Sequence, residues 1–315
     1  MTKIFGPVPS RRLGRSLGIN NIPPKICSYS CAYCQLGPTK QMQVERTAFF
    51  KPEDILFEVN EKVKRAKEVG ANIDYLTFVA DGEPTLDINI GKEIELLKNL
   101  GYKIAVITNA SLLWRQDVRE ELSKADWVSI KVDSIGEKNW RKINCPHRSL
   151  TLNDVFDGIR IFAKSYQGEL VTETMLVKSI NDTIDCLKEI AEFLSELKPF
   201  KAYISIPIRP PALRWVMCPG EEVINQAYQI FAEGINNVEY LIGYEGSAFS
   251  FTGNIEEDLL SITSVHPMRE DAVKKFLERA EGTWDVIQTL ISGGKIKEVE
   301  YRGTKFYMRK FDKKL

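Results

Sequence analysis

Three cysteines, Cys27, Cys31 and Cys34, lie close together in the run CSYSCAYC. Three thiolates at this spacing can bind three irons of a cubic iron–sulfur cluster, which leaves the fourth iron open to a ligand that is not protein. A structural zinc site needs a fourth ligand. The remaining cysteines and histidines are far along the chain, at Cys145, His147, Cys186, Cys218 and His266. The spacing therefore favours an open iron–sulfur site.

Other interpretations of these cysteines stay open. A zinc site completed by a remote cysteine would use the same residues. Disulfides suit secreted chains, but the N-terminal run MTKIFGPVPSRR lacks the apolar segment of a signal peptide. Inert buried cysteines are not expected, because Ser28, Tyr29, Ser30 and Gln35 make the segment a polar loop. No second cluster is expected, because the remaining cysteines show no CxxC pairing.

The composition favours no strongly charged partner. The 315 residues include 43 basic and 43 acidic side chains, so the formal net charge is zero and no global field attracts nucleic acid or membranes. The longest apolar runs, such as YLTFVA at 75–80, have the length of a strand and not of a membrane span. We therefore expect a soluble, cytoplasmic protein without membrane contact.

Strand and helix patterns alternate along most of the chain. Six segments rich in β-branched and aromatic residues are expected as strands, at 16–20, 74–80, 103–109, 127–133, 169–177 and 201–208. Apolar residues at helical spacing predict helices at about 52–69, 88–100, 113–124, 152–166, 182–197 and 220–233. This α/β alternation implies a parallel sheet with right-handed crossovers, and it places chemistry at the carboxyl ends of the strands.

The CxxxCxxC motif ahead of this strand–helix succession resembles the radical S-adenosylmethionine (radical SAM) enzymes, over about residues 15–245. The resemblance implies a partial (β/α)6 TIM-like barrel, a 4Fe–4S cluster held by the three cysteines, and SAM chelated by the unique iron. One electron then cleaves SAM to methionine and a 5′-deoxyadenosyl radical. Tyr33, the residue before the last cysteine, would pack against the adenine of SAM. Within the family, the chain is loosely similar to wybutosine-synthesis and glycyl-radical-activating enzymes.

The first two long strands end in polar turns. In DGEPT, Gly82 permits a tight turn and Glu83 projects a carboxylate towards the strand ends. This run resembles the GGE-type turn of the family, which contacts the amino group of SAM, with Asp81 in place of the first glycine. A capped turn without ligand contact is the alternative. Asn109, in a Thr-Asn-Ala ending similar to the family's TNG, would face the ligand or cap a helix.

Polar residues also follow the later strands. Lys131 and Asp133 alternate in VSIKVD, so both face one side, either as SAM contacts or as a structural ion pair. The run VKSIND resembles the V-x-G-x-N-D turn of glycyl-radical-activating enzymes, which would place Asn181 near SAM, although Ser179 occupies the glycine position. Weaker candidates for contact with a ligand on these strands are Glu173, Thr174 and Arg209.

Three arginines, Arg11, Arg12 and Arg15, precede the cysteine motif. Guanidinium groups bind carboxylates and phosphates through paired hydrogen bonds, so the three could clamp an anionic substrate. Solvated surface arginines are the commoner case, and the sequence leaves both possibilities open.

The strand–helix alternation stops before the C-terminal part of the chain. Two helical patterns followed by an alternating hairpin pattern predict a winged-helix-like domain at 253–315, beside a radical SAM core domain at 1–252. Residues 264–315 hold twelve basic and eight acidic side chains, which gives modest support to contact with nucleic acid. The loose resemblance to the wybutosine-synthesis group implies RNA rather than DNA. Docking to a protein or to the core domain is the alternative.

The predicted function is therefore SAM cleavage by a radical enzyme. Its substrate is not identified by the sequence, with RNA and protein among the options, and its electron would come from an external flavodoxin- or ferredoxin-type donor. One alternative is an iron–sulfur redox sensor that regulates nucleic-acid binding, and another is a zinc-binding adaptor. A sensor would not need Glu83 or an inward Lys131 and Asp133, so these residues favour the enzyme.

Overall fold

One curved sheet of eight strands organises the protein. The structure, a computed structural model, describes residues 3–243, 249, 251, 253–265 and 267–310. In spatial order the strands are β1 (Ile4–Ser10), β2 (Gly14–Ile19), β5 (Tyr75–Phe78), β6 (Lys103–Thr108), β7 (Trp127–Lys131), β8 (Glu169–Met175), β9 (Lys201–Ser205) and β10 (Val238–Leu241). Neighbours from β2 to β10 are parallel, whereas β1 is antiparallel to β2.

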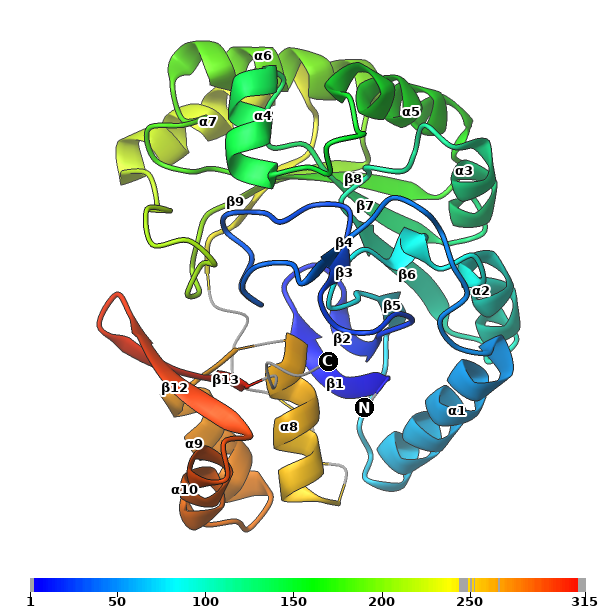
Figure 1. The fold of residues 1–315 in the computed structure, drawn as a ribbon, viewed down its shortest axis with the longest axis vertical. Coiled ribbons are helices and arrows are strands. Elements are labelled where there is room, and N and C mark those ends of the chain that lie inside the picture. Colours follow the sequence, from blue (N-terminus) through cyan, green and yellow to red (C-terminus); the bar gives the residue numbers. More distant parts are fainter. Residues whose placement is uncertain (1–2, 244–248, 250, 252, 266, 311–315) are drawn as a thin grey trace.

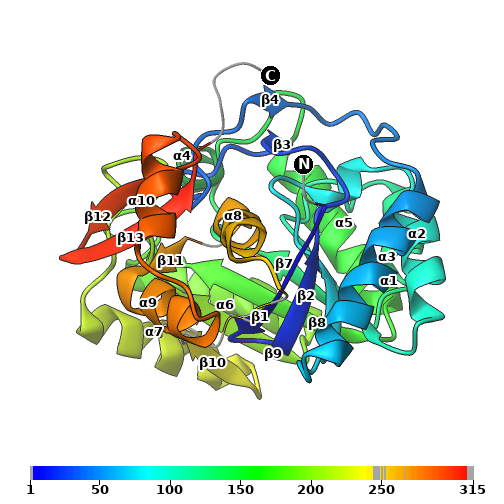
Figure 2. The ribbon, with the colours of Figure 1, turned by 90° about the horizontal axis from the view of Figure 1, so that it is seen from below.

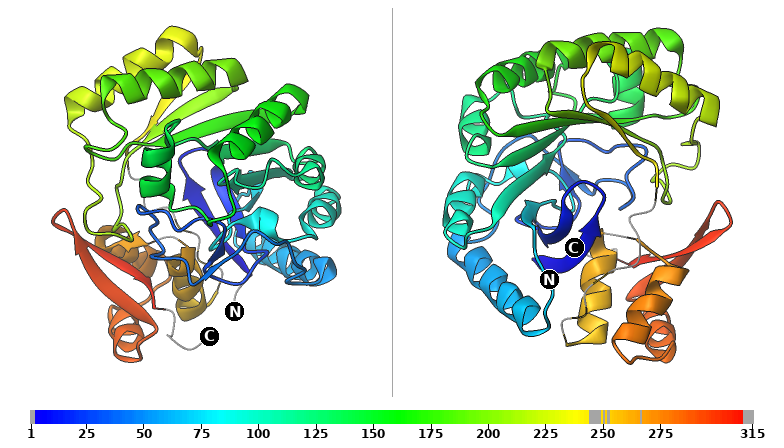
Figure 3. Two further views of the ribbon diagram at one scale, coloured as in Figure 1. Left: turned by 45° about the horizontal axis from the view of Figure 1, so that its top comes forward. Right: turned by 180° about the vertical axis from the view of Figure 1, so that it is seen from behind.

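Helices cover the outer face of this sheet, which curves into part of a barrel (Figures 1 and 3). They are α1 (Pro52–Glu68), α2 (Ile90–Lys98), α3 (Gln116–Leu122), α5 (Leu152–Ser165), α6 (Ile184–Leu197) and α7 (Glu221–Gly234). The predicted α/β partial barrel is confirmed. Among the described residues, no helix is both long enough and apolar enough to cross a membrane.

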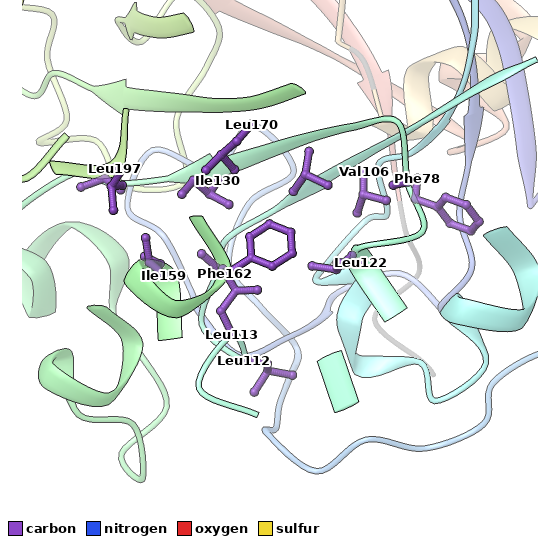
Figure 4. Close-up of a cluster of buried hydrophobic side chains, with 14 of the residues drawn as sticks. Phe78, Val106, Leu112, Leu113, Leu122, Ile130, Ile159, Phe162, Leu170 and Leu197 are labelled. Atoms are coloured by element: carbon purple, nitrogen blue, oxygen red, sulfur yellow. The ribbon is translucent and has the colours of Figure 1, made fainter. Parts of the chain in front are cut away.

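The apolar spacing of each helix explains its place against the sheet. In α1, the buried residues Ile55, Val59, Val63 and Ala66 recur every three or four positions, and Pro52 fits the first turn, where its missing N–H costs no hydrogen bond. Figure 4 shows the result further along the sheet, where Val106, Ile130 and Leu170 from the strands gather with Ile159 and Phe162 from α5. This packing fixes the strand ends that carry polar residues.

Several elements were not predicted from the sequence. β1 contains Pro7 and Pro9, which argue against a strand, but it lies at an edge of the sheet, where missing N–H donors are tolerated. β10 forms the other edge and adds a seventh parallel strand to the expected six. The short helix α4 (Glu137–Asn144) follows β7 and packs through Trp140 and Ile143. A short two-stranded sheet joins β3 (Ile26–Cys27) and β4 (Gln41–Met42).

The C-terminal elements pack against β1. Their order is α8 (Ile255–Val265), β11 (Met268–Arg269), α9 (Glu270–Arg279), α10 (Asp285–Ser292), β12 (Ile296–Tyr301) and β13 (Thr304–Arg309), and the three strands form one antiparallel sheet. Phe5 and Val8 of β1 share a buried core with Leu259, Ile262 and Phe276, and α8 lies alongside β1 (Figure 2). The winged-helix-like assignment, and RNA contact through it, stay predictions. Residue 252, at the predicted domain boundary, lies outside the described residues.

Candidate active site

A cavity of about 340 Å³ lies inside the curved sheet and brings together most of the residues singled out in the sequence. Cys27, Cys31 and Cys34 line it from one side, and all three are free thiols that are partly exposed. Residues that follow the carboxyl ends of the parallel strands line it from the other sides, as the barrel rule predicts. The residues predicted to bind SAM that lie on its wall are Tyr33, Gly82, Glu83, Asn109 and Lys131, and the weaker candidates Glu173 and Arg209 also line it.

Burial disfavours ionisation of two of the three thiols while no metal is bound. Desolvation raises the pKa of Cys27 to about 12, with further contributions from the charges of Glu83 and Cys34. It also raises the pKa of Cys31 well above its usual value. A thiol in such a place ionises only when a cation compensates the charge, and the irons of a cluster supply that cation. Among the described residues, no three His, Cys, Asp or Glu side chains are grouped around a single ion position.

Hydrogen-bond donors point at two of the sulfurs. The Sγ of Cys27 accepts from the backbone N–H of Tyr29 and from Asn109 Nδ2, both at 3.5 Å. The Sγ of Cys31 accepts from Asn144 Nδ2 at 3.7 Å. Hydrogen bonds to the sulfurs are one of the means by which a protein tunes an iron–sulfur cluster. Asn109 thus lies beside Cys27, while its Oδ1 accepts from Ser111 N at 2.9 Å, and its contact with SAM stays a prediction.

The loop of residues 27–34, called the cysteine loop below, is held by the unpredicted helix α4. The backbone N–H of Ala32 donates to Ile143 O at 2.7 Å, and that of Ser30 donates to Cys145 O at 3.0 Å. Cys145 ends α4 in a left-handed conformation with φ 43°. Its role is therefore to close the helix beside the loop, and Cys145, Cys186 and Cys218 do not line the cavity.

Gly82 and Glu83 form a turn that rests on the strand leading into Cys27. A Cβ on Gly82 would lie 1.7 Å from the carbonyl oxygen of Ile26, so only glycine fits. The carboxylate of Glu83 is 1% exposed and accepts four hydrogen bonds. Their donors are Thr85 N at 3.1 Å, Thr85 Oγ1 at 2.6 Å, Thr108 Oγ1 at 2.6 Å and Asn109 N at 2.7 Å. Glu83 therefore fastens the end of β5 to the end of β6.

Asp81, which the sequence marked only as a replacement for a family glycine, is the acid with hydrogen-bonding capacity to spare. It is 3% exposed and lines the cavity. Its Oδ1 has no hydrogen-bond partner among the described residues. Burial raises the pKa of Asp81 to about 7, and the positive charge of Lys25 opposes that shift. A buried acceptor of this kind is costly unless a ligand supplies a donor.

Lys131 and Asp133 do not pair with each other. Lys131 Nζ lies 2.5 Å from Glu173 on the neighbouring strand and 5.7 Å from the centre of the Tyr33 ring. Asp133 comes after the end of β7, so the strand alternation no longer applies to it. It accepts hydrogen bonds from Tyr33 Oη at 2.5 Å, Asn144 Nδ2 at 2.7 Å and Met175 N at 2.8 Å. Lys131 therefore forms its ion pair with Glu173 and not with Asp133, the partner expected from the sequence.

Asn181 lies behind the cavity wall. It is fully buried and does not line the cavity. Its Nδ2 donates to the carbonyl oxygens of Asp133 and Met175, at 2.7 and 2.8 Å, and its Oδ1 accepts from Val177 N at 2.7 Å. Ser179 has φ 61°, which explains why a glycine is favoured at that position. Asn181 holds Asp133 in place and does not face the cavity.

The arginines have different surroundings. Arg11 and Arg12 line the cavity, and Arg15 is exposed outside it. Arg12 forms an ion pair with Glu173, which therefore joins Arg12 and Lys131. These cations hold the pKa of Glu173 well below its usual range, against the opposing effect of burial. Arg209 also lines the cavity, where it donates to Gln35 Oε1 at 2.6 Å, next to Cys34. Thr174 is buried and bonds to Val132 O.

A three-cysteine loop over the carboxyl end of a curved parallel sheet defines a class of enzyme, and this chain belongs to the radical SAM superfamily. The superfamily's sequence model matches residues 21–194. The enzymes of this superfamily use a 4Fe–4S cluster and SAM, which are the cofactors predicted from the sequence. The protein is therefore an iron–sulfur enzyme.

The chain is also similar to individual proteins in sequence or in fold. The chain is 50% identical over 311 residues to a UPF0026 protein of Methanocaldococcus jannaschii, covering 98% of this chain and 96% of the relative. The solved structure of TYW1 with a lysine–pyruvate adduct bound is similar in fold, with a TM-score of 0.55, 16% identity, and coverage of 71% of this chain and 76% of that one. A radical SAM methyltransferase from Sphaerobacter thermophilus is also similar in fold. Its TM-score is 0.54, its identity is 16%, and the match covers 74% of this chain and 69% of that one.

Proposed function

We propose that Cys27, Cys31 and Cys34 hold the 4Fe–4S cluster and that SAM binds in the cavity beside them, so that the protein removes a hydrogen atom from a substrate. The observation that carries this proposal is the single cavity that the three thiols share with the turn at 81–83. The reduced cluster, when bound, supplies the electron that cleaves SAM to methionine and a 5′-deoxyadenosyl radical. The residues of this chain bind and orient the reactants and exclude water.

Asp81 is the acceptor that we assign to the ammonium group of SAM. Glu83 was predicted for this role, but its carboxylate already accepts four hydrogen bonds. Asp81 lines the same cavity with an oxygen that has no partner among the described residues. A charge-assisted hydrogen bond from an ammonium group would satisfy that oxygen. Glu83 and Gly82 then act as positioning residues.

Tyr33 and Lys131 would face SAM, while Asp133 and Asn181 position them. Tyr33 lines the cavity, and its hydroxyl is fixed by Asp133, so the ring is held in one orientation for contact with the adenine. Lys131 lies over that ring and is oriented by Glu173. Asp133 is fixed in turn by Asn181 through its backbone carbonyl. The redox-sensor alternative gains nothing from this arrangement, since a sensor requires no cavity beside the cysteines.

Anaerobic reconstitution tests the ligand assignment. The protein is loaded with iron and sulfide, reduced with dithionite and incubated with SAM, and 5′-deoxyadenosine is measured. We expect product from the native chain and from Cys186→Ala, whose thiol does not line the cavity. We expect none from Cys31→Ala, together with loss of the cluster absorbance. A fully loaded, reduced native protein that leaves SAM intact would overturn the proposal.

SAM affinity tests the assignment of Asp81 separately. Loss of a hydrogen bond to a charged group costs about 1.5 to 3 kcal/mol, so Asp81→Asn should weaken SAM binding to the reconstituted protein by roughly 10- to 100-fold. Equilibrium dialysis with labelled SAM measures this without catalysis. Asp74→Asn is the control and should bind SAM as the native protein does, because Asp74 lies outside the cavity, just before β5, where it accepts from the backbone N–H of Arg15. Equal affinity in Asp81→Asn would remove Asp81 from the site.

A further inference from the structure

Three large apolar side chains are exposed within five residues of the loop after β9. Leu213, Trp215 and Met217 are 37%, 39% and 54% exposed, whereas Val216 is 2% exposed and anchors the loop. We call residues 213–217 the apolar patch. Exposed apolar groups of this kind, and an exposed tryptophan in particular, are typical of surfaces that bind another protein.

The apolar patch lies directly on the outside of the cysteine loop. The backbone N–H of Leu213 donates to Ala32 O at 3.0 Å, and Ala32 stands between Cys31 and Tyr33. Val216 packs with Ala32, Ile143 and Val177 in one small buried cluster. Figure 1 shows the yellow-green segment after β9 reaching the blue segment that carries the cysteines. A partner bound to the patch would therefore be separated from the cysteines by the backbone at Ala32 and this small buried cluster.

Exposed basic residues surround the apolar patch. Lys142 Nζ lies 5.5 Å from the centre of the Trp215 ring, and Arg214 is exposed within the patch itself. Lys178 is exposed, and its backbone N–H donates to Met217 O at 2.9 Å. On the same elements, Glu137 is paired with Arg141, whereas Asp182 keeps its negative charge, since among the described residues only the backbone N–H of Ser179 donates to it. The basic side chains Lys142, Arg214 and Lys178 outnumber this one acid. The charge around the patch thus complements an acidic partner.

We propose that the apolar patch is the docking site of an acidic one-electron carrier protein. The inference rests on the proposed function, because an iron–sulfur cluster in the cysteine loop is what would receive the electron. One electron leaves the carrier, which is oxidised, and enters the cluster, which is reduced, with no proton or bond exchanged. Electron-transfer complexes are small and weak, so a patch of this size with steering charges suffices.

The position of the patch favours a carrier over a substrate. None of residues 213–217 lines the cavity, so a partner bound on the patch would not occupy the cavity in which SAM is proposed to bind. A substrate must reach the radical inside the cavity, whereas an electron must reach only the cluster. An RNA would also be attracted by the basic residues, and the experiment below separates it from a carrier.

Two measurements test the docking site with purified flavodoxin and purified 2[4Fe–4S] ferredoxin as acidic carriers. Titration calorimetry on the cluster-free protein gives the affinity for each carrier at low and high salt. Stopped-flow absorbance on the reconstituted protein gives the rate of cluster reduction by each reduced carrier and by dithionite. The variants are Trp215→Ala and the double variant Lys142→Glu/Arg214→Glu. The control is Phe57→Ala/Lys64→Glu, on the exposed face of α1.

We expect at least one carrier to bind the native protein, more weakly at high salt. Both patch variants should lower its reduction rate at least 10-fold, while the dithionite rate and the control variant stay unchanged. Equal carrier rates in native and patch variants, or no reduction by either carrier, would overturn the inference. The inference would also be overturned if the patch variants lost affinity for a 20-nucleotide RNA but kept the native affinity for both carriers. Failure of SAM cleavage after dithionite reduction would instead count against the proposed function.

Discussion

The carbonyl oxygen of Ile26 lies 1.7 Å from the place that a Cβ on Gly82 would occupy, and it accepts the backbone N–H of Glu83 at 3.1 Å. Ile26 precedes Cys27, so the turn after β5 sets the position of the first cysteine of the loop. The cysteine loop and the turn after β5 are thus joined through the peptide group between Ile26 and Cys27. This contact explains why a glycine follows the end of that strand.

Replacing Gly82 should disturb the cysteine loop. In Gly82→Ala, the new methyl group overlaps backbone that cannot rotate away, and overpacking of this kind costs about 1 to 3 kcal/mol. We expect that loss in urea unfolding of the cluster-free protein, together with reduced iron content after reconstitution. Gly243→Ala is the control, because nothing lies within 4 Å of its added Cβ. Unchanged iron content in Gly82→Ala would contradict the contact.

Glu83 should contribute to stability even without SAM. Its carboxylate accepts from two N–H groups and two hydroxyls, whereas the amide of Glu83→Gln turns one acceptor into a donor that faces other donors. Buried hydrogen bonds to a charged group contribute about 1.5 to 3 kcal/mol each, so we expect a loss of at least about 2 kcal/mol in urea unfolding of the cluster-free protein.

Thr85→Val, which removes one hydroxyl donor and keeps the carboxylate, is the matched comparison for Glu83→Gln and should cost less. If Glu83→Gln leaves the stability of the cluster-free protein unchanged and weakens only SAM binding, the carboxylate is a ligand contact as the sequence suggested. That outcome would reverse the assignment of the ammonium group to Asp81.

Sequence reasoning located the cysteines and most of the strand ends because both depend on local patterns. Two patterns can be recognised without knowledge of any tertiary contact: the spacing of Cys27, Cys31 and Cys34, and the run of apolar residues before Gly82. The partner of Lys131 could not be recognised from the sequence, because Glu173 is distant along the chain. The register of β7 and β8 places the two residues side by side. The hydrogen bonds of Glu83 could not be predicted for the same reason, since two of them come from Thr108 and Asn109 at the end of another strand.

The shared carboxylate of Glu173 should be essential to the cavity wall. It pairs with Lys131 and with Arg12, and its side chain is 3% exposed. In Glu173→Gln, two cations lose their partner inside the fold, and breaking a buried pair in this way costs about 3 to 5 kcal/mol. Urea unfolding at pH 7 measures the loss. Glu239→Gln, which breaks the exposed pair with Lys201, should cost under about 1 kcal/mol. Similar losses in the two variants would contradict this ranking.

Glu93 on α2 should make stability fall as the pH rises. It is fully buried, and burial, with the nearby charge of Asp87, raises its pKa from the usual 4.5 to about 9. Between these two values the unfolded chain has lost the proton that the folded chain keeps, so increasing pH favours the unfolded state. The slope approaches about 1.4 kcal/mol per pH unit for one proton.

Glu93→Gln stays neutral at every pH, so its stability relative to the native protein should increase steadily from pH 5 to pH 8. Urea unfolding of the cluster-free chain at each pH gives this difference, provided that the denaturant slope m is the same for both proteins. Glu95→Gln, on the same helix with its carboxylate 59% exposed beside Lys124, should follow the native protein across the range. If Glu93→Gln also follows the native protein, Glu93 is ionised in the folded state, and α2 must then open enough to hydrate it.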